Sequence, residues 1–94
     1  MPIATLTLEL LLPGCTTLKE KRGRLKPLLS ALRKEFNVAA AEMGHHDHHE
    51  VATIGLVTLG NDARTLDQFL AVIPRWIESR RPDLQLMDHH LEIL

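Results

Sequence analysis

The sequence predicts an α+β fold with the element order β-α-β-β-α-β. Right-handed crossovers close this order into a ferredoxin-like sandwich, a four-stranded antiparallel sheet with two helices on one face. Three observations predict it: segments of strand-like character, two segments with apolar residues at helical spacing, and capping residues before each helix. The 94 residues suffice for one hydrophobic core, so we expect a single domain over residues 1–94.

The first predicted strand covers residues 3–12 and ends at Pro13-Gly14. Its buried face consists of alternate residues, namely Ala4, Leu6, Leu8, Leu10 and Leu12. This period of two is typical of a strand with one face in the core. Residues 37–43 predict a short strand of small residues, residues 51–59 a β-branched and apolar strand, and residues 84–94 the final strand.

The first helix is predicted to open at Thr17, because Glu20 three residues later completes a capping box. Its buried stripe consists of Leu18, Leu25, Leu28, Leu29, Leu32 and Phe36. Pro27 lies inside this helix, where it has no amide hydrogen and its ring crowds the carbonyl of Gly23. We therefore expect the helix to bend or to start late between these two residues.

The second helix is predicted to begin after Asp62, its N-cap, and to end at Arg80-Arg81-Pro82. Arg80 and Arg81 are placed to complement the carboxyl end of the helix dipole. Its apolar face consists of Leu66, Phe69, Leu70, Ile73, Trp76 and Ile77. Pro74 falls in the interior of this helix, near the edge of the apolar face.

The sheet face away from the helices is predicted to carry small residues. They are Thr5, Thr7, Ala39, Ala41, Thr53 and Gly55. Such a face is either a docking surface or an ordinary solvated sheet face. The two edges of a sheet this small are open to pairing, so we expect a homodimer through this face or through an edge strand.

Composition narrows the class of protein. The formal net charge is −1, which argues against a strong nonspecific nucleic-acid binder. Cys15 is the single cysteine, so an intrachain disulfide is excluded and a reducing cytoplasm is expected. No apolar stretch approaches the roughly 20 residues of a membrane span, and the first residues lack the basic region of a signal peptide.

Seven cations fall within residues 19–34, namely Lys19, Lys21, Arg22, Arg24, Lys26, Arg33 and Lys34. Four of them, Lys19, Arg22, Lys26 and Arg33, form a row along one flank of the leucine stripe, about 21 Å long. This row is a candidate nucleic-acid-binding site that follows phosphates; the alternative is an ordinary solvated helix face. The chain has no tyrosine, and both phenylalanines are predicted to be buried, so the stacking platform of an RNA-recognition sheet is missing.

The run from His45 to Glu50 holds four imidazoles and two carboxylates. The candidate metal ligands in it are His45, His46, Asp47, His48 and His49. Three interpretations remain open: a solvated hairpin, incidental affinity for a divalent metal such as Zn²⁺ or Ni²⁺, and a functional metal site. His89-His90 is predicted at the opposite sheet edge, so it joins such a site only through a partner subunit or an unusual hairpin. Cys15 has no base placed beside it, and we predict no catalytic residue.

Several short segments carry a family resemblance. They are Glu9-Leu10 with Pro13-Gly14, Leu18-Lys19-Glu20-Lys21-Arg22, Leu25-Lys26, Phe36-Asn37-Val38, Ala41-Glu42, His45 with Asp47, Asn61-Asp62 and Glu92-Ile93-Leu94. Together they resemble the YlxP-like family of small uncharacterised bacterial proteins, and the Leu-Lys-Glu-Lys-Arg segment is the most specific part. The chain departs from the family pattern around His48, His49 and Val51, where an aromatic and a basic residue are common.

The resemblance implies a ferredoxin-like fold and a gene among those of translation and ribosome maturation. It implies no catalytic residues. With the basic row, it leads us to expect a non-enzymatic binding protein that associates with ribosomal RNA or a ribosomal particle through the first helix. The alternatives are a homo-oligomeric interaction module without nucleic-acid contact and a His-rich metal-binding protein. We expect no cofactor beyond incidental metal, no small-molecule substrate and no membrane association.

Overall fold

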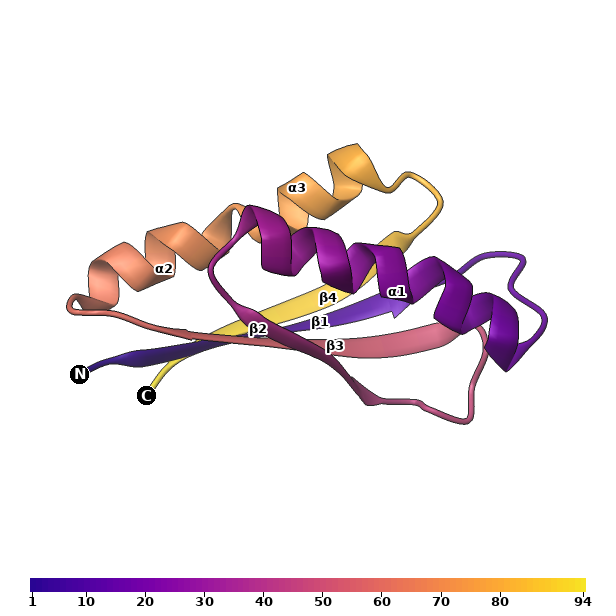
Figure 1. Cartoon of the computed structure of the whole chain (residues 1–94), viewed down its shortest axis with the longest axis horizontal. Helices are drawn as coiled ribbons and strands as arrows, with labels where there is room; N and C mark the ends of the chain where they lie inside the picture. Colours follow the sequence, from indigo (N-terminus) through magenta and orange to yellow (C-terminus); the bar gives the residue numbers. More distant parts are fainter.

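A computed structural model describes all 94 residues and has the predicted ferredoxin-like architecture (Figure 1). Its elements are β1 (Ile3–Leu11), α1 (Leu18–Glu35), β2 (Ala39–Gly44), β3 (Val51–Leu59), α2 (Ala63–Ala71), α3 (Ile73–Arg80) and β4 (Gln85–Ile93). The strands form one sheet in the order β2-β3-β1-β4, and every neighbouring pair is antiparallel. The helices cover one face of this sheet, as Figure 1 shows. The predicted strand boundaries are correct to within two residues.

Strand β1 lies at the centre of the sheet, between β3 and β4. Its even-numbered residues from Ala4 to Leu10 are at most 2% exposed, which confirms the predicted alternation. Leu8 lies opposite Ile54 of β3 and His89 of β4. The buried residues of the sheet and the helices form one core cluster of 19 residues. Two sheet edges, at β2 and β4, are left without a neighbouring strand.

Helix α1 begins where the capping residues predict. The hydroxyl of Thr17 accepts a hydrogen bond from the Glu20 amide at 3.0 Å, and the Glu20 carboxylate accepts one from the Thr16 amide at 3.1 Å. The helix is unbroken from Leu18 to Glu35, so the expected late start is wrong, while the alternative of a bend near Pro27 stays a prediction. Pro27 and Gly23 both lie on the exposed side of the helix, and water can bond the carbonyl that Pro27 leaves free.

The second helical segment is divided in two, which corrects the prediction of one helix. Val72 ends α2, and its amide bonds back to the carbonyl of Leu70. Pro74 has no amide hydrogen to continue the α-helical ladder, but it fits the first turn of a new helix. Asp62 is the N-cap as predicted; hydrogen bonds from the Thr65 hydroxyl and amide hold the pKa of its carboxyl below the ordinary value.

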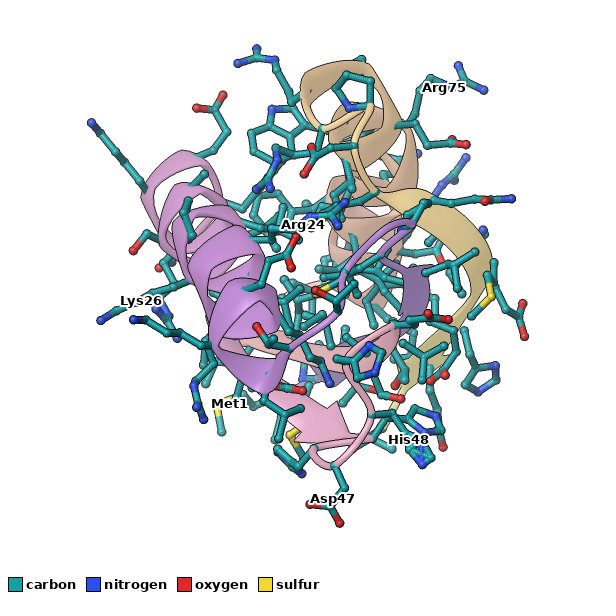
Figure 2. The ribbon with its side chains drawn as sticks, turned by 90° about the vertical axis from the view of Figure 1, so that its right-hand side faces the viewer. Met1, Arg24, Lys26, Asp47, His48 and Arg75 are labelled. Atoms are coloured by element: carbon teal, nitrogen blue, oxygen red, sulfur yellow. The ribbon has the colours of Figure 1, made fainter.

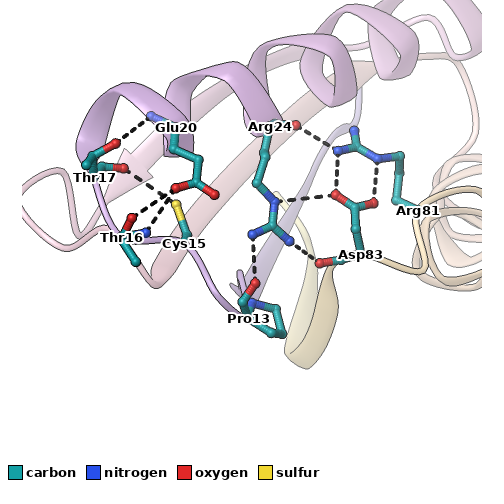
Figure 3. Close-up of polar contacts among 8 residues, drawn as sticks. All are labelled: Pro13, Cys15, Thr16, Thr17, Glu20, Arg24, Arg81 and Asp83. Atoms are coloured by element: carbon teal, nitrogen blue, oxygen red, sulfur yellow. Dashed lines mark hydrogen bonds and ion pairs between the residues drawn. The ribbon is translucent and has the colours of Figure 1, made fainter.

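A charged clamp joins α1 to the two loops at one end of the sheet. Figure 2 shows Arg24 lying between α1 and the other helices. Arg81 donates to both carboxylate oxygens of Asp83, each at 3.0 Å, and to the Arg24 carbonyl at 2.9 Å (Figure 3). Arg24 donates to the Pro13 carbonyl at 2.9 Å and lies 3.5 Å from the Asp83 carboxylate. Arg81 therefore serves this clamp, and not only the dipole of the preceding helix.

The contact between Arg81 and Asp83 predicts how the stability of the fold depends on pH. The hydrogen bonds from Arg81 hold the pKa of the Asp83 carboxyl below its ordinary value, so the folded state favours the ionised form. The stabilisation is present above about pH 4, the ordinary range of an aspartate, and is lost as the pH falls through the lower folded-state value. We expect Asp83→Asn to be less stable than the wild type at pH 7 by under about 1 kcal/mol, because the carboxylate is partly exposed.

Urea unfolding of both proteins at pH 7 and at about pH 2.5, followed by circular dichroism, checks this. The two midpoints are expected to differ at pH 7 and to approach each other in acid. An equal difference at both pH values contradicts a role for the carboxylate charge.

Candidate functional site

The side chain of Lys21 is buried beneath the His-rich turn. It is 1% exposed, although it belongs to the cation-rich segment of α1. Its ammonium group donates to the carbonyl oxygens of His45 and His48, each at 2.7 Å, and lies 2.8 Å from a carboxylate oxygen of Glu42. That oxygen of Glu42 is buried and has no other polar partner. All three protons of the ammonium thus have an acceptor.

The His-rich segment forms a tight turn between β2 and β3. The His48 amide donates to the His45 carbonyl at 3.0 Å, and His45 has a φ of 60°, in the left-handed region. A residue other than glycine is uncommon in that region and costs conformational energy. The contacts of the Lys21 ammonium with both carbonyls offset this cost. Lys21 therefore fixes the shape of the turn and attaches it to the first turns of α1.

The imidazoles of the turn have separate partners. His46 lies 3.3 Å from the Glu42 carbonyl, and Nδ1 of His49 donates to the Cys15 carbonyl at 2.7 Å. The ring of His45 lies 3.5 Å from the Glu9 carboxylate, and 5.7 Å from the ring of His48 between centroids. No three histidine, cysteine, aspartate or glutamate side chains are grouped as metal ligands. The predicted metal site of His45, His46, Asp47, His48 and His49 stays a prediction.

The structure divides the predicted row of cations on α1. Lys19, Arg22 and Lys26 are exposed, and their side chains form no ion pair. Figure 2 shows Lys26 pointing away from the body of the molecule. Arg33 instead donates to the Ala40 carbonyl of β2 at 2.6 Å. This hydrogen bond places the row beside the β2 edge of the sheet.

Lys21 connects the helix that carries the cation row to the His-rich turn. Lys19 and Arg22 lie within two residues of Lys21 on α1, with Glu20 between Lys19 and Lys21. The sequence suggested two separate surfaces and did not identify Lys21 as their connection. One signal in the sequence could have indicated that Lys21 is buried. Lys21 lies four residues before Leu25, which places it on the buried stripe of the helix.

Cys15 lies close to this region but is not arranged as a nucleophile. It is fully buried, and its thiol donates weakly to the Thr17 carbonyl at 3.5 Å. His49 contacts the main chain of Cys15 and not its sulfur. None of the helices combines the length and the apolar character needed to cross a membrane.

The fold and this region define a small α+β sandwich protein with a basic helix attached to a His-rich turn. The family model described as "Protein of unknown function (DUF503)" matches residues 3–91, so the chain belongs to this family. The chain is also similar to "Uncharacterized protein YlxP" of Bacillus subtilis (strain 168), with 27% identity over 71 residues. That alignment covers 76% of this chain and 77% of the relative. The predicted resemblance is confirmed.

The burial of Lys21 predicts that its replacement lowers the stability of the protein. We expect Lys21→Met to lower the free energy of unfolding by about 3 kcal/mol, because it leaves a buried carboxylate oxygen and two carbonyl oxygens without their cation. Replacing Glu42 by Leu in the same protein is expected to restore part of the loss. Urea unfolding measures all of these values.

Lys19→Met is the matched control, because Lys19 is exposed on the same helix. It is expected to change the stability by less than about 0.5 kcal/mol. If Lys21→Met is as stable as Lys19→Met, the ammonium does not hold the turn.

Proposed function

We propose that this protein is a non-enzymatic binding protein that associates with the phosphate backbone of RNA through α1. The observation that carries the proposal is the row of exposed and unpaired cations Lys19, Arg22 and Lys26. A cation on RNA gains free energy by releasing counterions, and it does so best when no carboxylate already neutralises it.

The distribution of charge supports this proposal. All 11 lysines and arginines lie in the helices or, for Arg81, at the cap of α3, and the four strands contain none. Although the net charge is near zero, the helical layer carries the lysines and arginines and the sheet layer carries none. The helical layer can attract a polyanion that the sheet layer repels.

The mode of binding follows from the aromatic residues. Phe36 packs against Phe69 and Trp76, with ring centroids 5.9 and 5.4 Å apart, and Trp76 also carries Arg80 over its ring. These rings serve the packing of the helices, and the open sheet face has no phenylalanine, tyrosine or tryptophan on which a base could stack. We propose binding by backbone charge and shape, without base readout.

The proposed partner is ribosomal RNA or a ribosomal particle, as the family resemblance implies. The proposed compartment is the cytoplasm, where the free thiol of Cys15 stays reduced. The proposal needs no cofactor and no catalytic group.

The test compares two variants that lose the same charge. Arg22→Gln with Lys26→Gln is expected to weaken binding to a labelled single-stranded RNA and to purified ribosomal subunits. The slope of log affinity against log salt is expected to fall by about 1.4, which is about 0.7 for each phosphate that the variant no longer neutralises. Fluorescence anisotropy measures RNA binding, and pelleting over a salt series measures subunit binding.

The matched control is Arg64→Gln with Arg75→Gln, which removes two exposed cations from α2 and α3. It is expected to keep the affinity and slope of the wild type. Equal loss in both variants indicates attraction by total charge alone, and the absence of any binding by the wild type contradicts the proposal.

Substitution of the exposed histidines separates the turn from the helix. His46→Gln with His48→Gln is expected to leave RNA binding unchanged at pH 7.5, because the proposal assigns phosphate binding to the cations of α1. A loss at pH 7.5 that exceeds the loss in the helix variant shows that the turn is the primary site.

A further inference from the structure

The open face of the sheet has an apolar half over β2 and β3. A shallow groove of about 420 Å³ lies there, and its lining includes Thr5, Thr7, Ala39, Ala41, Met43 and Val57. Met43 is 63% exposed, and its side chain lies over Gly55, in the space that a Cβ at that position would need. The helices pack on the other face, so nothing within the chain covers this groove.

The other half of the same face, over β1 and β4, is acidic. The register of the strands places Glu92 opposite Thr5, His90 opposite Thr7, and Asp88 opposite Glu9. Since the even-numbered residues of β1 face the core, these partners of odd-numbered residues lie on the open face. We call Glu9, Asp88 and Glu92 the acidic band.

The acidic band lacks a compensating cation. Glu9 and Asp88 are direct cross-strand partners, and like charges in that position repel. Glu9 accepts a hydrogen bond from Thr53 at 2.6 Å and lies near His45, while Glu92 lies 3.8 Å from His90. No lysine or arginine occurs in any strand. A positively charged ligand would relieve this repulsion.

We propose that the open sheet face docks a basic amphipathic segment of a partner protein. The apolar side chains of that segment occupy the groove, and its lysines or arginines lie against Asp88 and Glu92. The acidic band repels phosphate, which disfavours RNA on this face. A second copy that docked through its own open sheet face would bring the same carboxylates and no cation, so charge complementarity favours the basic partner over this symmetric arrangement. This inference does not depend on the proposed RNA site of α1.

The test uses a dye-labelled synthetic peptide of about 18 residues, long enough to form a helix, with leucine on one face and lysine on the other. Fluorescence anisotropy is expected to show saturable binding to the wild-type protein. A peptide with glutamate in place of lysine, and one with serine in place of leucine, are expected to bind at least about tenfold more weakly.

Two charge-matched double variants locate the site. Asp88→Asn with Glu92→Gln is expected to weaken binding of the basic peptide about tenfold, whereas Asp67→Asn with Glu78→Gln, on α2 and α3, is expected to change it less than twofold. Ala41→Gln places a polar side chain on the lining of the groove and is expected to weaken binding as well. Circular dichroism checks that each variant remains folded.

Three outcomes would overturn the proposal. One is the absence of saturable binding by the basic peptide. Another is equal weakening by both charge variants, which would indicate nonspecific attraction. The third is a wild-type mass in sedimentation equilibrium that is twice the monomer and falls to the monomer in Ala41→Gln, which would show that the groove holds a second copy.

Discussion

The contact between the Lys21 ammonium and the His-rich turn is the constraint on which the candidate site depends. A charge removed from water is stable only when oxygen atoms replace its hydration shell, and here two carbonyls and one carboxylate do so. The same contact sets the conformation of a turn that contains a left-handed residue, His45. It also fixes where β2 ends relative to α1, and therefore where the free cations of the helix lie with respect to the sheet.

The elements with strong local signals could be predicted from the sequence. The alternation in β1, the capping residues Thr17 and Asp62, and the order of the elements together imply the observed topology. One error concerns Leu18, which was predicted in the buried stripe and is 36% exposed. Two others concern proline. Pro27 and Pro74 remove the same kind of hydrogen bond, but α1 continues past the first while the second separates α2 from α3. Whether a helix continues through a proline depends on tertiary packing, which sequence spacing does not describe.

The candidate site was less predictable, because its central residue has a side chain that is usually exposed. Lys21 counts as one cation among seven in the sequence, and only the three-dimensional position of the turn distinguishes it. Arg24 and Arg33 are likewise engaged with carbonyl groups of other segments. Three of the seven cations thus serve the fold. Composition alone overstates the charge that this helix can offer to a partner.

The separation of charge between the layers gives the molecule two chemically distinct sides. The helices carry every lysine and arginine except Arg81, which caps α3, and the open sheet face carries carboxylates beside an apolar groove. Under the two proposals, an anionic and a cationic partner would bind different sides of the molecule and would not compete. The helices lie on one face of the sheet and the groove lies on the other, so neither partner would have to move for the other to bind.

Because the Lys21 amine is buried beneath the His-rich turn, its chemical reactivity depends on whether the turn is open or closed. Of the four lysines, Lys19, Lys26 and Lys34 have amines in contact with solvent, whereas the amine of Lys21 is enclosed. An acylating reagent reaches an enclosed amine only while the structure around it is open. The rate at which Lys21 is acylated, relative to the other three lysines, therefore reports how often the His-rich turn opens. Mass spectrometry of peptides from the labelled chain measures this rate.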